Sequence, residues 1–393
     1  MKIFFSTQWK YENILLYIMI VVSFSLIAYY HLNSGYSMSS DSKRFSSWAD
    51  DLIKLNFNFY DFFLIDKKDY RPHLLFASVP VLLIALCKVM FVNEWQFAFL
   101  ILNLLLVFFS LIIFVKCLLL IKVRLVLISL TLPLIVVSVD ILIWPKFILS
   151  DMIYAFLVLT ATYLIIKGIT KNKIYYFYLF LIMFLLLSTR PSSFPVIFAI
   201  VLFIIIPKYQ TIFKPKIILL LLATVFISTP FIFSLIYSFI ELNFSGNAKI
   251  DFMTNGVKDG MIIHDRPETW VNKPDNFIDI IFIYFLRLIN FFNPYASTFS
   301  IVHIFLNVLQ ISLILLSISI WSVYGNYIKN FNKIFLFIML LSLFVAAFHS
   351  FILIDYDWRY RFPIILPLIM LIPISLEMIF KKIDLNKSNT CKD

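Results

Sequence analysis

Four short polar segments interrupt long apolar runs, and each holds residue types that can carry out acid–base or phosphate chemistry. They are residues 39–51 (SSDSKRFSSWADD), 144–156 (WPKFILSDMIYAF), 188–193 (STRPSS) and 355–367 (DYDWRYRFPIILP). The first two supply carboxylates, which can accept a proton from a hydroxyl or hold a metal ion. The last two supply arginines, whose planar guanidinium groups bind phosphate oxygens in pairs.

Two carboxylates stand at the starts of predicted helices. Residues 39–55 predict an amphipathic helix, because apolar side chains recur there every three to four positions. Asp41 lies at the start of that helix, where it could cap the helix or act as a base. Asp151 begins a later apolar helix, which either it or Ser150 could cap. The two aspartates could divide base and orienting roles, or share a divalent metal ion such as Mg²⁺ or Mn²⁺.

The R-Y-R motif near the end of the chain is the most specific of these patterns. Arg359 and Arg361 flank Tyr360 just before the last apolar run. Arginine is disfavoured in a short loop outside the membrane, so something must hold both side chains there. Two nearby acids, Asp355 and Asp357, could pair with them. A phosphate on at least one arginine is the stronger interpretation, and Tyr360 becomes a candidate for substrate contact.

One more arginine and two histidines complete the set of candidate residues. Arg190 lies in a tight turn between two short apolar runs, where it could reach lipid headgroups or meet an anionic substrate. His73 begins an apolar surface helix, and His264 lies in the polar stretch MIIHDRPETW. The histidines lack the spacing of metal ligands, so we treat these two as candidates for substrate contact.

The composition is that of a membrane protein. Of 393 residues, 62% are hydrophobic and 14% are charged, against roughly 25% charged in soluble domains. The net charge of +11 fits cytoplasmic loops rich in lysine and arginine, and not a nucleic-acid site. The three distant cysteines make neither a disulfide framework nor a metal motif, and the six glycines make no nucleotide-binding loop.

About ten apolar runs are long enough to cross a bilayer core of about 30 Å as helices. They are roughly residues 13–31, 97–121, 125–143, 151–167, 174–189, 191–207, 216–241, 300–324, 333–354 and 362–380. Two further runs, 73–92 and 276–292, could also cross, which would bring the total to about twelve.

The distribution of lysine and arginine favours keeping those two runs at the membrane surface. With a cytoplasmic N-terminus, most cationic loop residues then face the cytoplasm, as the positive-inside rule requires. Residues 1–393 become a single integral membrane domain with large outside loops at 32–96 and 242–299 and a cytoplasmic tail at 381–393. Each outside loop contains an interfacial helix, and all four candidate segments face outside.

The order of these motifs resembles that of the GT-C-type integral membrane glycosyltransferases, especially the bacterial protein-mannosyltransferase and aminoarabinose-transferase branch. The matching segments, in chain order, are SSDSKRFSSWADDL, RPHLLFASVPVLLIAL, ILIWPKFILSDMIYAFL, TRPSS and RYRFPIILPLIML. The resemblance implies an all-α, GT-C-like bundle and a polyprenyl-phosphate-linked sugar as donor.

The resemblance also implies roles for the candidate residues. Asp41 would take the proton of an acceptor hydroxyl, Asp151 would match the acidic residue of the family's second outside turn, and Arg359 or Arg361 would hold the departing phosphate. The enzyme would be a hexosyl- or pentosyltransferase of the bacterial cytoplasmic membrane, acting on a cell-envelope glycan, lipid or protein outside. Two rival functions are a lipid-linked polysaccharide polymerase or ligase, and a non-enzymatic flippase for lipid-linked glycans.

Overall fold

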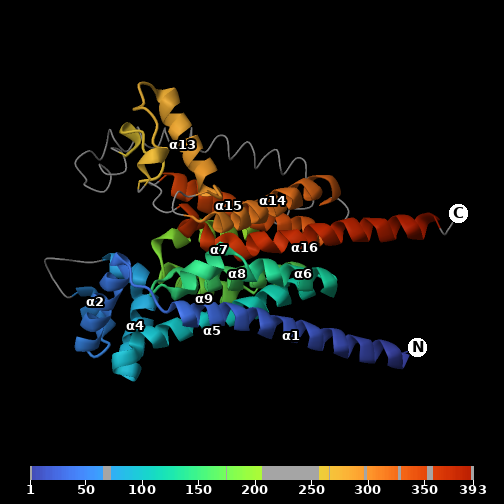
Figure 1. Ribbon diagram of the computed structural model, residues 1–393, viewed down its shortest axis with the longest axis horizontal. Helices are drawn as coiled ribbons and strands as arrows, with labels where there is room; N and C mark the ends of the chain where they lie inside the picture. Colours follow the sequence, from blue (N-terminus) through green and yellow to red (C-terminus); the bar gives the residue numbers. More distant parts are fainter. Residues whose placement is uncertain are drawn as a thin grey trace. The chain divides into compact units, whose positions relative to one another are not determined.

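The computed structural model describes residues 2–64, 72–173, 175–205, 256–264, 266–295, 299–325, 329–351 and 357–390. Nearly all of them lie in helices, and no strand occurs within these ranges (Figure 1). The chain forms two compact units: unit 1 comprises Met1–Phe194 and Phe362–Asp393, and unit 2 comprises Pro195–Arg361. The predicted all-α class is confirmed for the described residues, whereas the single membrane domain stays a prediction.

Unit 1 contains the N-terminal half of the chain and most of the last helix. Its main helices are α1 (Lys2–Ser34), α2 (Ser40–Lys54), α3 (Phe59–Leu64), α4 (Ser78–Phe91), α5 (Trp95–Leu120), α6 (Leu125–Val136), α7 (Val139–Ile143), α8 (Asp151–Lys171), α9 (Tyr176–Leu187) and α16 (Asp357–Thr390). Short 3₁₀ turns join them: η1 (Pro72–Ala77), η2 (Val92–Glu94), η3 (Trp144–Lys146) and η4 (Pro191–Ser193). Helix α16 begins in unit 2 and continues into unit 1.

Unit 2 contains fewer described elements. They are α10 (Phe194–Ile205), η6 (Pro267–Thr269), α13 (Phe277–Phe291), α14 (Ile301–Tyr324) and α15 (Lys329–Phe351). Helix α13 packs against α15, with Ile283, Tyr284, Leu288 and Phe291 buried on one face. Those positions recur at three- to four-residue spacing, as expected for an amphipathic helix.

Six helical stretches are long and apolar enough to cross a membrane, so the chain is an integral membrane protein with several spans. They are Ile14–Ser34, Leu74–Leu120, Asp151–Lys171, Ile301–Tyr324, Asn330–Phe351 and Arg359–Asp384. A seventh arises if α6 and α7–η3, bent by 49°, form one broken span. Helices α9 and α10 have 12 residues each, about 18 Å of helix, which is shorter than the bilayer core. The predicted run 216–241 lies outside the described residues, and the count of about ten stays a prediction.

The stretch Leu74–Leu120 is too long for one crossing. Its 47 residues would extend about 70 Å as a helix, more than twice the core thickness. Val92, with φ 30° and ψ −85°, ends α4 and separates it from α5. Figure 1 shows α4 running across the direction of α5. A single continuous span over this stretch is therefore excluded by its length and by the break.

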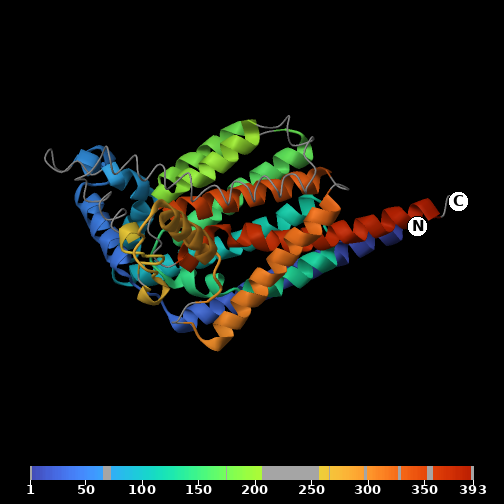
Figure 2. The same cartoon turned by 90° about the horizontal axis from the view of Figure 1, so that it is seen from above.

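Most long helices of unit 1 run alongside one another (Figure 1). Helix α5 packs on α8 and α1, α1 packs on α6, and α2 packs on α4. In both views the first turns of α1 and the last turns of α16 extend to the same side of unit 1, opposite α2 and α4 (Figures 1 and 2). Hydroxyls inside the unit bond to carbonyls one turn earlier, as in Ser110 to Leu106 and Thr162 to Val158, which satisfies them without water.

Candidate functional site

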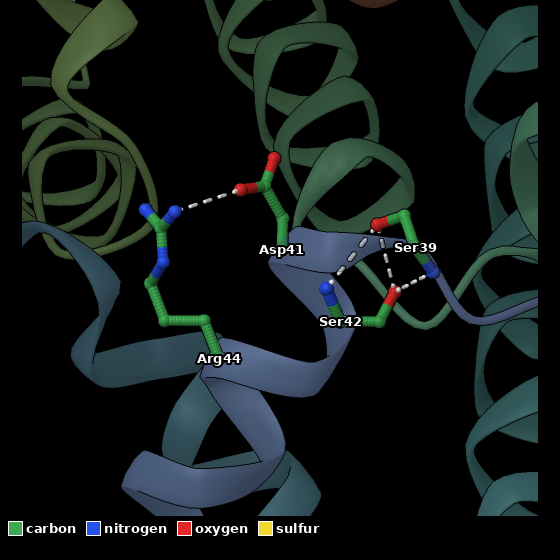
Figure 3. Close-up of polar contacts among 4 residues, drawn as sticks. All are labelled: Ser39, Asp41, Ser42 and Arg44. Carbon is green, nitrogen blue, oxygen red and sulfur yellow. Dashed lines mark hydrogen bonds and ion pairs between the residues drawn. The ribbon is translucent and has the colours of Figure 1, made fainter.

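The first turn of α2 is built by a reciprocal pair of serines (Figure 3). The Ser39 hydroxyl accepts a hydrogen bond from the Ser42 backbone N–H at 3.2 Å, and the Ser42 hydroxyl accepts one from the Ser39 N–H at 3.0 Å. This capping box makes Ser39 the N-cap. The alternative in which Asp41 is the capping residue is therefore wrong, because two serines at N-cap and N3 already satisfy these donors.

Asp41 lies in the first turn of α2, where its carboxylate does not serve as the cap. Asp41 forms an ion pair with Arg44 at 3.8 Å, and both side chains are exposed, at 37% for Asp41 and 61% for Arg44 (Figure 3). A long, exposed pair of this kind holds neither side chain strongly. The carboxylate lies at the N-terminal end of a helix, which carries partial positive charge. Asp41 therefore combines a negative charge with access from outside the protein.

Helix α2 is fixed in place by α4. Ala49 and Leu52 are completely buried on its inner face. The Lys88 ammonium of α4 forms an ion pair with Asp50 at 2.7 Å, donates to the Ser46 carbonyl at 3.0 Å, and lies over the ring of Trp95. Apolar burial and one anchored lysine thus orient the amphipathic helix that carries Asp41.

A parallel β-bridge joins the segment before Asp41 to the segment before Asp151. The Ser37 N–H donates to the Lys146 carbonyl at 2.9 Å, and the Ile148 N–H donates to the Ser37 carbonyl at 3.2 Å. The Asn103 amide holds the same turn from α5 by donating to the Pro145 and Phe147 carbonyls. Segments about 110 positions apart therefore lie side by side, which the sequence predicted only as a shared membrane level.

Asp151 and Arg190, both predicted site residues, form a buried ion pair. The Arg190 Nη1 donates to the Asp151 Oδ1 at 2.5 Å, with side-chain exposures of 13% and 1%. In this environment each charge stabilises the other, and losing one partner would leave the second uncompensated. Asp151 is thus an oriented and neutralised carboxylate, and Arg190 contacts an anion of the protein itself.

The turn at Arg190 is anchored on three sides. The Tyr154 hydroxyl of α8 donates to the Ser192 carbonyl at 2.7 Å. The Ser193 hydroxyl donates to the Arg190 carbonyl at 2.6 Å. The Val79 N–H at the start of α4 donates to the Ser188 carbonyl at 3.0 Å. The helices that begin at Ser78 and Asp151 and the turn after α9 therefore meet at one end of unit 1.

His73 belongs to η1, directly before α4. Its backbone position is close in sequence to the anchored start of α4, and its side chain lies outside what the structure describes. Its role as a substrate contact stays a prediction.

In unit 2, Tyr360 is part of an aromatic stack. Its ring lies 4.1 Å from the His349 ring, at an interplanar angle of 21°, and His349 in turn stacks on Phe291 at 6.0 Å and 13°. His349 is buried, whereas Tyr360 keeps partial exposure. The stack fixes the direction of the R-Y-R motif as α16 begins.

The two arginines of the R-Y-R motif differ in environment. Arg361 is 3% exposed, and its Nη1 donates to the Asn293 carbonyl at 2.9 Å, just beyond the C-terminal end of α13. A cation is favourable there because unpaired carbonyls carry partial negative charge. Arg359 is partly exposed. The arginine better placed to meet a ligand from outside is therefore Arg359, with Arg361 held behind it by the protein.

His264 lies in a compact loop that a buried arginine holds. Arg287 of α13 is completely buried, and its Nε and Nη2 donate to the Met261 carbonyl at 3.1 and 2.7 Å. None of the described carboxylates forms an ion pair with Arg287. Burial lowers the pKa of Arg287 to about 10, an effect that the nearby Tyr284 partly offsets. The side chain stays charged at neutral pH.

The sequence predictions assign no role to three buried basic residues: Arg287, His349 and His31. A lone arginine in an apolar run, such as Arg287, is itself a signal of a functional site. His31 is completely buried near the end of α1, and its Nε2 is 3.0 Å from the Ile141 carbonyl. Nothing in the spacing of these residues shows their contacts, because each partner is distant in sequence.

The predicted metal ion would bind at Asp41 and Asp151. Within the described ranges, no group of three or more His, Cys, Asp or Glu side chains is placed to hold a metal ion. Asp41 and Asp151 supply oxygen ligands of the kind that Mg²⁺ or Mn²⁺ prefers. A divalent metal therefore remains a prediction for this site.

Comparison with known proteins adds no relative to this picture. No family model, no curated protein and no solved structure matches the chain. The residues of the chain that bear on its function are an accessible carboxylate and a neutralised one in unit 1, and a stacked R-Y-R motif in unit 2.

Proposed function

We propose that the protein is a membrane glycosyltransferase that moves a sugar from a polyprenyl-phosphate donor to a hydroxyl of a cell-envelope glycan, lipid or protein. The acceptor oxygen attacks the anomeric carbon, and the bond between that carbon and the phosphate oxygen breaks. The acceptor proton passes to the Asp41 carboxylate, and the polyprenyl phosphate leaves with the bonding electrons. One displacement inverts the anomeric centre. The motif resemblance supplies the reaction class, and the contacts described above support the residue roles.

The observation that carries the proposal is the bridge between Ser37 and Phe147. It holds the start of the Asp41 helix beside the turn that leads into Asp151. Two carboxylates that belong to distant parts of the sequence are thereby assigned to one end of unit 1. This is the arrangement that a base and an orienting carboxylate require.

The environments of the two carboxylates favour different roles. The side chain of Asp41 is 37% exposed, so an incoming hydroxyl can reach it and pass its proton to it. Asp151 is buried and paired with Arg190 at 2.5 Å, so it is suited to orienting groups around it. Arg190 pairs with Asp151, and its contact with the donor phosphate stays a prediction.

The phosphate-binding role falls to Arg359 and Arg361. The leaving phosphate gains charge in the transition state, and a fixed guanidinium lowers the cost of that charge. Arg359 is the more accessible of the two, while Arg361 is fixed by the Asn293 carbonyl. Tyr360, between them, is a candidate for contact with the sugar.

We further propose that α2, α4 and α13 are interfacial helices at the outer face of the bacterial cytoplasmic membrane. Helix α4 lies across α5 instead of continuing it (Figure 1), and α13 has 15 residues, too few for a span. Both chain termini would be cytoplasmic, in line with their position at the end of unit 1 opposite α2. The lipid-linked donor then meets Asp41 at the height of its headgroup.

The test compares two carboxylates of the same helix. Asp41→Asn removes the proposed base, and Asp51→Asn is the matched control, because Asp51 is 38% exposed and lies 3.8 Å from Lys54 at the same i,i+3 spacing. Purified variants in lipid discs receive a panel of radiolabelled polyprenyl-phosphate sugars with membrane acceptors. Loss of a general base predicts a fall in kcat of roughly a hundredfold or more for Asp41→Asn, and none for Asp51→Asn.

A helix-stability control separates loss of the base from loss of the helix. Ser39→Ala removes the cap and should lower stability by about 1 kcal/mol, yet it leaves the carboxylate of Asp41 intact. Transfer by Ser39→Ala close to wild type, with loss in Asp41→Asn, supports the proposed role. Wild-type transfer by Asp41→Asn would remove Asp41 from the reaction.

A polysaccharide polymerase or ligase is the second candidate, because one observation favours it. The His349–Tyr360 stack places a histidine next to the R-Y-R motif, and such enzymes rely on arginine and histidine outside the membrane. Retained activity in Asp41→Asn together with loss in His349→Gln and Arg359→Gln would favour this function over single sugar transfer.

A further inference from the structure

The polar loop of unit 2 has a defined fold of its own. This loop, residues 256–271 without position 265, closes through a hydrogen bond from the Val271 N–H to the Gly260 carbonyl at 3.0 Å. The Trp270 indole N–H donates to the Ile263 carbonyl at 2.9 Å, and the Ile263 N–H donates to the Thr269 hydroxyl at 3.2 Å. The loop therefore presents a fixed surface to α13.

The loop and the R-Y-R motif share one apolar cluster. Val257, Ile262 and Ile263 of the loop pack with Ile283 and Tyr284 of α13, and all five are buried. Phe351 and Tyr360 pack against this cluster from the end of α15 and the start of α16. Tyr360 therefore rests on a surface that the loop helps to form. Ile263, the residue directly before His264, and Tyr360 therefore belong to one cluster although 97 positions separate them.

Arg287 is the polar link between α13 and the loop. Two of its N–H groups converge on one oxygen, the Met261 carbonyl, and its Nη1 has no hydrogen-bond partner among the described residues. A fully buried cation without a paired carboxylate is costly. The carbonyl bonds and the Tyr284 ring, 5.5 Å from the guanidinium carbon, offset part of that cost. Charged donors form the stronger hydrogen bonds, which suits a latch between two elements.

We propose that Arg287 is a positioning residue: it latches the 256–271 loop onto α13 and so holds Tyr360 and the neighbouring Arg361 in the geometry that receives the donor phosphate. The role in transfer rests on the proposed function; the latch itself does not. Arg287 acts through the loop and does not touch the reacting atoms.

Gly260 offers an independent way to open the same latch. Its φ is +74°, and an added Cβ would lie 2.2 Å from the Val271 carbonyl oxygen. Gly260→Ala must therefore shift the backbone of the loop, while the charge of Arg287 is kept. If Arg287 works by positioning, both variants should have the same consequence.

The experiment measures loop exchange and donor KM in the full-length protein. The variants are Arg287→Met, Arg287→Lys and Gly260→Ala, with Lys273→Met as control, because Lys273 is 77% exposed and pairs only with Asp259 at the surface among the described residues. Arg287→Met and Gly260→Ala should speed amide hydrogen exchange in peptides over 256–271, with α8 unchanged. The same two variants should raise the donor KM roughly tenfold, with a smaller fall in kcat.

Arg287→Lys is the conservative variant and Lys273→Met is the control for the change in donor KM. Arg287→Lys keeps a cationic donor for the Met261 carbonyl and should recover much of the loss in KM, and Lys273→Met should match wild type. A raised KM in Arg287→Met with a normal KM in Gly260→Ala would overturn positioning, since the charge alone would then matter. Unchanged exchange over 256–271 in Arg287→Met would overturn the latch. If the wild type transfers no sugar from any donor, the proposed function fails, and the exchange result alone decides the latch.

Discussion

The buried arginines of the two units are stabilised in different ways. In unit 1, Arg190 faces the carboxylate of Asp151 at 2.5 Å, and the pair is electrically neutral. In unit 2, Arg287 and Arg361 donate to the carbonyls of Met261 and Asn293. A carbonyl supplies a dipole and not a full negative charge, so the positive charge of Arg287 stays uncancelled by the described carboxylates.

This difference bears on where an anionic substrate can be held. A neutral Asp151–Arg190 pair orients its surroundings and attracts a phosphate weakly, since the cation is already satisfied. The Arg361 guanidinium, which the proposed function assigns to the donor phosphate, adds to the potential felt by an anion. Under the proposed function, the pair in unit 1 orients its surroundings and the arginines of unit 2 attract the phosphate, and three measurements test this difference.

The largest effect is expected from splitting the pair in unit 1. Asp151→Asn leaves the Arg190 guanidinium in a site with 13% side-chain exposure and without its counter-charge, which should cost about 3–5 kcal/mol. The double variant Asp151→Asn with Arg190→Gln removes both charges and should regain most of that loss. Thermal unfolding of the purified variants, followed by tryptophan fluorescence, measures this double-mutant cycle. Additive losses in the double variant would show that the pair is not coupled.

A smaller effect is expected from the carbonyl-held arginine of the R-Y-R motif. Arg361→Met breaks the bond to the Asn293 carbonyl and should lower stability by about 1.5–3 kcal/mol, the range for hydrogen bonds to charged groups. Arg359→Met is the control. Because Arg359 is partly exposed, this variant should lose less stability than Arg361→Met. Equal unfolding temperatures for the two variants would contradict the different environments described for these residues.

The smallest effect concerns Tyr284, which lies next to Arg287. It is absent at neutral pH and appears only at alkaline pH. Burial raises the pKa of Tyr284 from 10.0 to about 12, although the Arg287 cation opposes the shift. The folded state therefore keeps this proton when the unfolded state has lost it. Its contribution to stability is fully present below pH 10 and is lost as the pH rises towards 12. Unfolding temperatures of wild type and Tyr284→Phe should agree at pH 8 and diverge above pH 10, with the wild type falling faster. Parallel curves would mean that Tyr284 titrates normally.

The spacing of apolar residues predicted helix α2, but residue types alone did not predict which residue caps it. The spacing of Ala49 and Leu52 predicted the amphipathic helix, and both residues are buried. The exact cap depended on whether Ser39 and Ser42 bond to each other, and both serines and Asp41 are acceptable capping residues by type. Side-chain geometry therefore decided a question that residue types left open.

The role of Arg190 shows a different limit. The sequence placed Arg190 in a tight turn and Asp151 at a helix start, which the structure confirms. It did not show that they pair, because 39 positions separate them and an arginine attracts any nearby anion. The same holds for Arg287 and Met261, and for Tyr360 and His349, whose contacts join distant parts of the chain.

The amino-acid sequence was enough to predict a helical membrane protein and to locate the charged residues of its polar segments. Those properties follow from local composition, since apolar runs of sufficient length are helical in a bilayer and charges avoid its core. The partners of these charges follow from the packing of the helices: Arg190 neutralises Asp151, whereas Arg287 donates to a neutral carbonyl. Electrostatic and hydrogen-bond energies depend on distances of a few ångströms between residues far apart in sequence, and only the packing of the helices sets those distances.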